Sequence, residues 1–238
     1  MKISEAVWAV VDCETTGLDP TKDRIVEVAY RNSLSRTWAR LINPEIPIPC
    51  EASAIHHLTY GDIHEAEKWT HAMLTIQLDI GAKDILVAHN AAFDRSFMPK
   101  GLENLWICTE RLARHLLPDA PRYTNQVLRY YLGGASLSLE GMAPHRAAAD
   151  VIVTCFVFDR LVEKYLNEKR EDTPEALIAF AESPILFKTI PFGKYRGQAI
   201  ENVPLDYLVW CVRSMEDLNP DLKAQFNGIL RGELTPMP

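Results

Sequence analysis

Two carboxylates lie two residues apart at the end of an apolar run. Residues 7–11 have the pattern of a buried strand, and Asp12 and Glu14 follow directly, ahead of a Thr-Thr-Gly turn. Residues i and i+2 of a strand point to the same face, so we expect both acids to project side by side from the edge of an apolar core. Such carboxylates repel unless a cation lies between them, and Mg²⁺ or Mn²⁺ takes oxygen ligands. The pair predicts a divalent-metal site; the alternative is two solvated acids at a strand end.

Two later segments carry matching chemistry. A second apolar run at 85–88 ends in His-Asn-Ala-Ala-Phe-Asp, whose last residue is Asp94. A third segment contains His145 and Asp150 and then continues as an apolar helix. Five residues turn an ideal helix by about 140°, so these two side chains cannot share one helical face. We expect His145 in the loop before the helix and Asp150 in its first turns; the alternative for His145 is a surface histidine at a helix start.

Three motifs in this order resemble those of the DEDDh, or DnaQ-like, 3′→5′ exonuclease superfamily. They are Asp12-x-Glu14-Thr-Thr-Gly, His89-Asn-x-x-Phe-Asp94 and His145-x-Ala-x-x-Asp150. The resemblance covers about the first 166 residues. Segments at 54–59, 106–109 and 192–197 are similar to the exonuclease X branch of the superfamily and extend the resemblance nearly to the end of the chain.

The resemblance implies a two-metal nuclease site with four metal ligands and one base. In the family pattern Asp12 bridges both ions, which are Mg²⁺ or Mn²⁺, while Glu14 and Asp150 complete the first ion's site. Asp94 supports the second ion, and His145 is the general base that takes a proton from the attacking water. The catalytic residues implied are Asp12, Glu14, Asp94, His145 and Asp150.

The resemblance also implies contacts to the 3′-terminal nucleotide. The residues concerned are Thr15, Thr16, Gly17, Leu18, His56 and Asn90. Leu18 is expected to pack against the terminal base; the alternative is a plain turn with Leu18 in the core. Phe93 and His89 fit packing roles better, and His57 stands where many relatives have glycine.

The order of expected elements indicates an α/β fold. Strands over 8–14, 24–30 and 36–43 have short connections and predict an antiparallel meander. Helices and strands alternate afterwards: helices are expected over 60–80, 109–116, 123–132 and 145–166, and strands over 85–89 and 106–108. This order predicts a mixed central sheet flanked by helices, in agreement with the ribonuclease H-like fold that the resemblance implies.

Two domains are expected. We predict an exonuclease domain over 1–166, a charged linker or frayed helix end at 167–173 and a small C-terminal accessory unit over 174–238, with a helix at about 205–214. The accessory unit carries the motif Phe-Gly-Lys-Tyr-Arg-Gly at 192–197. Its Lys194 and Arg196 could hold phosphates while Tyr195 stacks on a base. A hairpin turn with solvated charges explains the motif equally well.

Composition limits the location and the mode of binding. Of 238 residues, 47% are hydrophobic and 24% charged, no apolar run is long enough to cross a bilayer, and residues 1–5 lack the pattern expected of a signal peptide. The five cysteines are scattered and are expected to be reduced, as in a cytoplasmic protein. A net charge of −7 predicts local binding at a nucleic-acid end rather than a broad basic footprint.

We therefore expect a metal-dependent 3′→5′ exonuclease that releases nucleoside 5′-monophosphates. The similarity to exonuclease X favours DNA over RNA, in repair or end trimming. One alternative is an RNA 3′-end trimming exonuclease similar to ribonuclease T or oligoribonuclease. Others are a proofreading subunit and a non-catalytic nucleic-acid-binding module. The sequence leaves the oligomeric state unknown and predicts no membrane partner.

Overall fold

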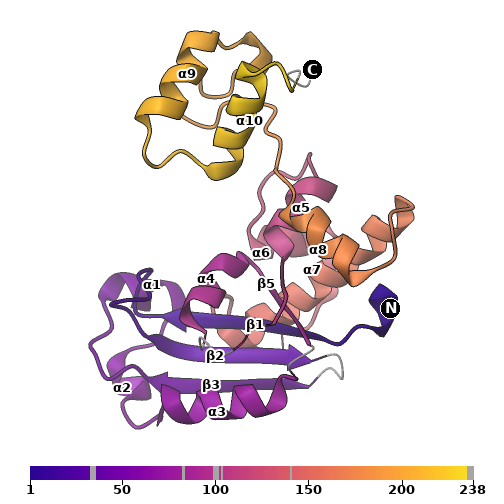
Figure 1. Ribbon diagram of the computed structural model, residues 1–238. Helices are drawn as coiled ribbons and strands as arrows, with labels where there is room; N and C mark the ends of the chain where they lie inside the picture. Colours follow the sequence, from indigo (N-terminus) through magenta and orange to yellow (C-terminus); the bar gives the residue numbers. More distant parts are fainter. Residues whose placement is uncertain (33–35, 82–83, 99–101, 103, 140, 235–238) are drawn as a thin grey trace. The chain divides into compact units, whose positions relative to one another are not determined.

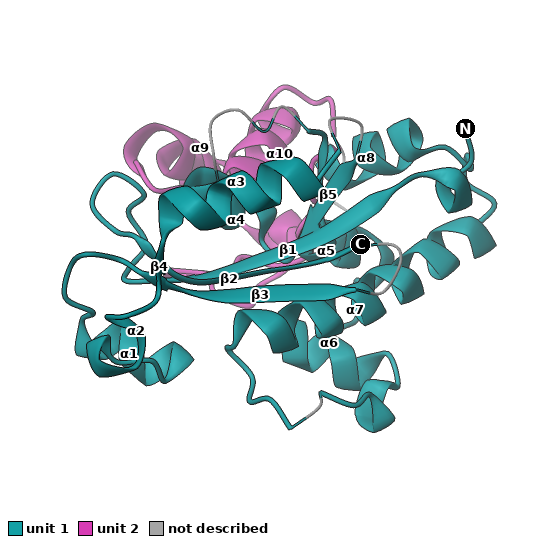
Figure 2. Cartoon of the chain, turned by 90° about the horizontal axis from the view of Figure 1, so that it is seen from below, with its two compact units in different colours: residues 1–182 teal, residues 183–238 magenta. Residues whose placement is uncertain are grey.

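The computed structural model describes residues 1–32, 36–81, 84–98, 102, 104–139 and 141–234. The chain divides into two compact units, Met1–Glu182 and Ser183–Pro238 (Figure 2). No helix formed by the described residues combines the length and the apolar character needed to cross a membrane.

A six-stranded mixed sheet forms the centre of the first unit. Its strands are β1 (Trp8–Thr15), β2 (Ile25–Asn32), β3 (Thr37–Asn43), β4 (Glu67–Lys68), β5 (Ile85–Ala88) and β6 (Trp106–Cys108), in the order β4-β3-β2-β1-β5-β6. The pairs β1–β2 and β2–β3 are antiparallel (Figure 1), whereas β1–β5, β5–β6 and β3–β4 are parallel. The predicted meander and mixed sheet are both confirmed.

Helices cover both faces of this sheet. The helices of the first unit are α1 (Cys50–His56), α2 (Tyr60–Ile63), α3 (Trp69–Asp79), α4 (Ala91–Phe97), α5 (Thr109–Leu116), α6 (Asn125–Tyr131), α7 (Ala147–Asn167) and α8 (Pro174–Glu182). In Figure 2, α3 and α4 lie on one side of the sheet and α6 and α7 on the other.

The alternation of β1 assigns its acids to one face. Ala9, Val11 and Cys13 pack in the same cluster as residues of α3 and α4, whereas Val10 packs with α7. Because strand side chains alternate, Asp12 and Glu14 continue the face of Val10. Both acids therefore point to the side of the sheet on which α7 lies.

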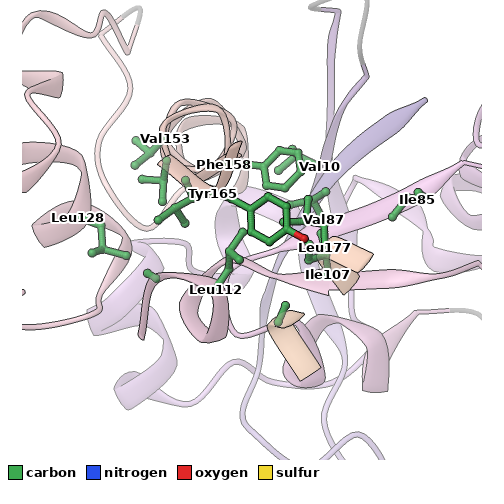
Figure 3. Packing of buried hydrophobic residues seen from close by; sticks show 14 of the residues in the cluster. Val10, Ile85, Val87, Ile107, Leu112, Leu128, Val153, Phe158, Tyr165 and Leu177 are labelled. Carbon is green, nitrogen blue, oxygen red and sulfur yellow. The ribbon is translucent and has the colours of Figure 1, made fainter. Parts of the chain in front are cut away.

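A large apolar core fixes α7 against this face. Val10, Val87 and Ile107 of the sheet belong to one buried cluster with Val153 and Phe158 of α7, and Val10 lies beside Phe158 in Figure 3. All five side chains are buried, and full burial of one such side chain stabilises the fold by about 1.5–3 kcal/mol. The core therefore holds the start of α7 in a defined position beside β1.

The first unit extends further than the sequence predicted. Helix α8 belongs to it, because Leu177 and Ile178 pack into the core beside α7. The segment 167–173 is ordered by local contacts rather than being a free linker: the Asp172 carboxylate accepts from the Ile3 backbone N–H, and Arg170 lies over the Phe180 ring. The boundary predicted at residue 174 thus falls after Glu182.

Two local predictions also need correction. The helix expected over 60–80 is interrupted, because α2 ends at Ile63 and the two-residue strand β4 pairs with β3 before α3 begins. Helix α6 begins at Asn125, two residues later than expected. His57 ends α1 in the left-handed conformation, with φ of 61°. Glycine adopts this conformation without steric cost, whereas histidine adopts it less often.

The second unit has its own small core. Its helices α9 (Leu205–Ser214) and α10 (Pro220–Leu230) bury Leu208, Cys211, Leu222 and Phe226 among others. The sequence predicted α9 but not α10. Helix α10 has a clear start signal, because the Asn219 side chain accepts from two backbone N–H groups of its first turn.

Candidate active site

Three carboxylates converge where β1 ends. One carboxylate oxygen from each of Asp12, Glu14 and Asp150 lies within 4.8 Å of the others. The first two come from one face of β1, and Asp150 comes from the first turn of α7, which packs on that face. Three hard oxygen donors at this spacing fit a divalent cation such as Mg²⁺ or Mn²⁺.

The fourth acid approaches from the neighbouring strand. Because β5 runs parallel to β1, the residues that follow β5 reach the same edge of the sheet. Asp94 lies in α4 after β5, is 2% exposed, and accepts a hydrogen bond from the Cys13 backbone N–H at 3.0 Å. It is not one of the three converging acids, but its charge raises the pKa of Asp12. We refer to Asp12, Glu14, Asp94 and Asp150 as the four acids.

Crowding and burial disfavour ionisation of the four acids. Burial raises the pKa of Asp12 well above its usual range, with Asp94 and Asp150 adding to the effect. Burial and the Asp150 charge raise the pKa of Glu14 to about 8, and burial raises that of Asp94 to about 7. Burial also raises the pKa of Asp150. A bound divalent cation would compensate this repulsion, so the donor set fits the metal that the sequence predicts.

His145 lies directly before α7, as predicted. Its backbone N–H donates to the Asp150 carboxylate at 3.0 Å, and its side chain is exposed. The residue has φ of 60°, which is uncommon for a residue other than glycine. The hydrogen bond to Asp150 helps to hold this conformation, so one of the four acids also anchors the backbone of the expected base.

An ion pair between a buried Glu27 and a partly exposed Arg146 joins α7 to the sheet beside the four acids. Glu27 of β2 lies directly opposite Glu14 in the antiparallel pair, where two like charges destabilise a sheet. Arg146 donates to both Glu27 oxygens at 2.9 Å, and the Ala147 N–H donates to Glu27 at 3.0 Å. Arg146 thus compensates Glu27 and fixes the first residue of α7, next to His145.

Sequence reasoning missed this ion pair. The available signal was Glu27 itself, a single acid inside an otherwise apolar strand, which is 3% exposed in the structure. A charged residue in a fully buried strand needs a partner of opposite charge. The signal did not say which of the 25 Lys and Arg residues was that partner.

A cavity of about 680 Å³ opens over the four acids, within the size range of ligand sites. Its walls also include Leu18, Asn90, Phe93, Arg114, Tyr123 and His145. Leu18 is 83% exposed, so the alternative that places it in the core is wrong. Phe93 packs partly against Phe97 and partly faces the cavity, so its predicted packing role holds in part.

Four of the predicted substrate contacts do not line this cavity: Thr15, Thr16, Gly17 and His56. The Thr15 hydroxyl donates to the Gly17 carbonyl, and the Thr16 hydroxyl donates to Asp23 at 3.0 Å. A Cβ on Gly17 would lie 2.5 Å from the Asp23 carboxylate, so the turn requires glycine there. These side chains shape the turn, and contact with a nucleotide remains a prediction.

The buried His56 and the partly buried His89 both have internal partners. His56 is 1% exposed, its Nδ1 accepts from the Leu58 N–H at 3.0 Å, and burial lowers its pKa. The His89 ring lies between the Thr109 hydroxyl at 2.9 Å and the Tyr123 carbonyl at 2.8 Å. His89 is the structural histidine that was predicted.

The far wall of the cavity was not anticipated. Arg114 pairs with Glu110 at 2.7 Å on α5 and lies over the Tyr123 ring, 4.5 Å from its centroid. Gln126 of α6 donates to Asp150 at 3.3 Å. No sequence pattern predicts this wall, because its residues come together only when α5 and α6 pack beside α7.

Comparison with known proteins identifies relatives across most of the chain. A family model described as "Exonuclease" matches residues 9–158, and one described as "Putative quorum-sensing-regulated virulence factor" matches residues 181–215. Exodeoxyribonuclease 10 of Escherichia coli (strain K12) is 30% identical over 221 residues, which cover 90% of this chain and 94% of that protein.

Solved structures agree with this assignment. Exonuclease X in complex with 5′-overhanging duplex DNA has a TM-score of 0.57 and 28% identity, and the match covers 73% of this chain and 99% of that one. An oligonucleotide complex of Escherichia coli exonuclease I has a TM-score of 0.55 and 16% identity, over 74% of this chain and 43% of that one, and shows the fold alone. The predicted ribonuclease H-like fold is confirmed. The chain, which presents its motif acids around one cavity, belongs to the DnaQ-like exonuclease family and is a nuclease, a hydrolase of phosphodiester bonds.

Proposed function

We propose that the protein is a metal-dependent 3′→5′ exonuclease that hydrolyses DNA to nucleoside 5′-monophosphates, in DNA repair or end trimming. The observation that carries the proposal is the convergence of Asp12, Glu14 and Asp150 within 4.8 Å, beside the exposed His145. An inactive binding module would not need to retain crowded acids that disfavour their own ionisation.

The four acids would hold two ions, Mg²⁺ or Mn²⁺. When bound, these ions would stabilise the negative charge that develops on the phosphate oxygens during hydrolysis. Asp12 is suited to the shared position because the charges of Asp94, Asp150 and Glu14 all act on it.

His145 is suited to remove a proton from the attacking water. Its side chain reaches the cavity while its backbone is held by Asp150 at 3.0 Å. The water oxygen forms a bond to phosphorus as its proton moves to the imidazole. The bond from phosphorus to the O3′ of the preceding nucleotide breaks, and that oxygen takes a proton from solvent. The terminal nucleotide therefore leaves with a 5′-phosphate.

Leu18 and Asn90 are suited to hold the terminal nucleotide. Leu18 exposes 83% of its surface on the turn after β1, and both residues line the cavity. An exposed leucine beside acidic groups offers an apolar contact for the face of a base. We propose that the other predicted contacts to the nucleotide are made indirectly, by holding the backbone of the site in position. These residues are Thr15, Thr16, Gly17 and His56.

DNA is the proposed substrate because of two relatives. One is named exodeoxyribonuclease 10, and the exonuclease X structure contains duplex DNA with a 5′ overhang. A reducing, cytoplasmic environment is proposed because all five cysteines are unpaired.

The test is digestion of 5′-labelled DNA and RNA oligonucleotides of one sequence by the purified chain, with Mg²⁺ or with EDTA. We expect a ladder that shortens from the 3′ end of DNA, only with Mg²⁺. An Asp12→Asn variant prepared in parallel excludes a contaminating nuclease. Digestion of RNA alone would favour the RNA-trimming alternative, and tight binding without hydrolysis would favour the non-catalytic module.

A further inference from the structure

The second unit exposes an aromatic row next to positive charge. Tyr195 meets Tyr207 edge-on, with ring centroids 4.7 Å apart and an interplanar angle of 68°. Tyr207 in turn stacks on Trp210 at 5.7 Å and 29°. Trp210 is 52% exposed, so the row ends in a large open indole on α9.

The glycine-rich motif builds the inner end of this row. The Thr189–Ala199 bridge closes the loop, and Gly193 has φ of 63°. A Cβ on Gly193 would lie 2.6 Å from the Tyr207 hydroxyl, so only glycine allows Tyr207 to approach. The motif is therefore a closed turn, which agrees with the hairpin alternative for its backbone.

Tyr195 is not the stacking surface that the sequence suggested. Its ring packs partly into the small core and against the edge of Tyr207. The Lys194 ammonium lies over the ring, 5.2 Å from its centroid. Trp210 is more suitable for stacking, because it is more exposed and Tyr207 supports it from one side.

Three exposed cations belong to the same unit as Trp210. Lys194 and Arg196 lie on the loop, and Arg213 follows Trp210 by three residues on α9, a spacing that makes them neighbours. None of the ion pairs among the described residues involves these three side chains. One acid, Asp206, lies a turn before Trp210, and its carboxylate accepts from the Tyr207 N–H.

The charge of the chain is divided unevenly between the units. Residues 183–238 contain six basic and six acidic residues, so the net charge of −7 resides in residues 1–182. The net charge of the second unit therefore does not repel a phosphate backbone. The negative charge of the first unit does repel it, except where bound metal ions compensate that charge.

We propose that the second unit binds single-stranded nucleic acid, with a base stacked on Trp210 and phosphates on Lys194, Arg196 and Arg213. An exposed aromatic ring near unpaired cations is a feature with which proteins bind single strands without sequence preference. A protein partner would be expected to bury a larger apolar patch. The proposed site lies entirely within the second unit and does not rest on the proposed hydrolysis.

The test is the binding of a 5′-fluorescein-labelled single-stranded dT oligonucleotide to the full chain, followed by fluorescence anisotropy in EDTA, where hydrolysis stops. Trp210→Ala should weaken binding about five- to a hundredfold, the loss of one base stack, while Trp210→Phe keeps most of the affinity. The Lys194→Ala/Arg196→Ala double variant should lower the salt slope by about 0.7 for each lost contact. Leu205→Ala and Lys223→Ala are controls for an exposed apolar side chain on α9 and an exposed lysine on α10.

Three results would overturn the proposal. They are wild-type protein that does not bind the oligonucleotide, a Trp210→Ala variant that binds as well as Leu205→Ala, and a double variant with an unchanged salt slope. A Trp210→Ala variant with unchanged affinity for the oligonucleotide would favour a protein partner for Trp210 instead. Digestion of short oligonucleotides with Mg²⁺ should be equal in wild-type and Trp210→Ala protein, so loss of the binding site and loss of the proposed hydrolysis are measured separately.

Discussion

Replacing Glu14 by glutamine should stabilise the metal-free protein. The structure raises the pKa of Glu14 from its usual 4.5 to about 8, through burial and the Asp150 charge. A carboxyl group with a raised folded-state pKa contributes stability that is complete below its unfolded pKa and is lost as pH rises through the folded value. Near pH 8 the wild-type protein has lost most of this stability because Glu14 ionises on unfolding, whereas the neutral amide of glutamine, which has a similar shape, does not ionise. At about 1.4 kcal/mol per unit, reduced because Glu14 is only partly buried, the gain is about 2–4 kcal/mol.

Thermal unfolding in EDTA at pH 8 and pH 5 measures this effect. For a unit of this size the gain should raise Tm by about 5–15 °C at pH 8 and shrink to a few degrees at pH 5. Glu65→Gln is the control, because the Glu65 side chain is 90% exposed and should leave Tm unchanged. Saturating Mn²⁺ should raise the Tm of wild-type protein more than that of Glu14→Gln. Equal Tm values for wild-type and Glu14→Gln protein at pH 8 would refute the crowding of acids described above.

Three further predictions concern single residues. Asp12→Ala should abolish hydrolysis with the fold intact by circular dichroism; wild-type turnover would exclude a shared ligand role. His145→Ala should reduce kcat by about 10²–10⁴ with Mn²⁺ binding unchanged; a kcat equal to that of wild type would point to another base. Glu27→Gln should cost about 3–5 kcal/mol of unfolding free energy, because it leaves Arg146 without its buried partner. The control Glu163→Gln loses only an exposed pair with Arg160 and should cost less than about 1 kcal/mol. Equal losses in the two variants would show that Glu27 does not form a buried interaction.

The sequence predicted the parts of the site that depend on local geometry. The position of Asp12 and Glu14 follows from strand alternation, and the placement of His145 before Asp150 follows from helical periodicity. Both depend only on neighbouring residues. The four acids then meet because β1 and β5 are parallel and α7 crosses the same face, which the family resemblance anticipated.

Features that depend on pairing between distant segments could not be predicted. Glu27 faces Glu14 only because of the β1–β2 register, and Arg146 reaches it from 119 residues away. The two-residue strand β4 has no pattern of its own. The apolar face of α8 is visible in the sequence, but nothing local decides which unit it joins.

We propose that Asp12, Glu14 and Asp150 hold a divalent cation, with a second ion shared between Asp12 and Asp94. The most direct test is anomalous diffraction from crystals of the protein soaked in Mn²⁺ and a non-hydrolysable 3′-terminal dinucleotide. We predict one Mn²⁺ peak among the three converging carboxylates and a second on the Asp94 side of Asp12. A protein that hydrolyses DNA in Mn²⁺ but shows no peak at these carboxylates would contradict the account.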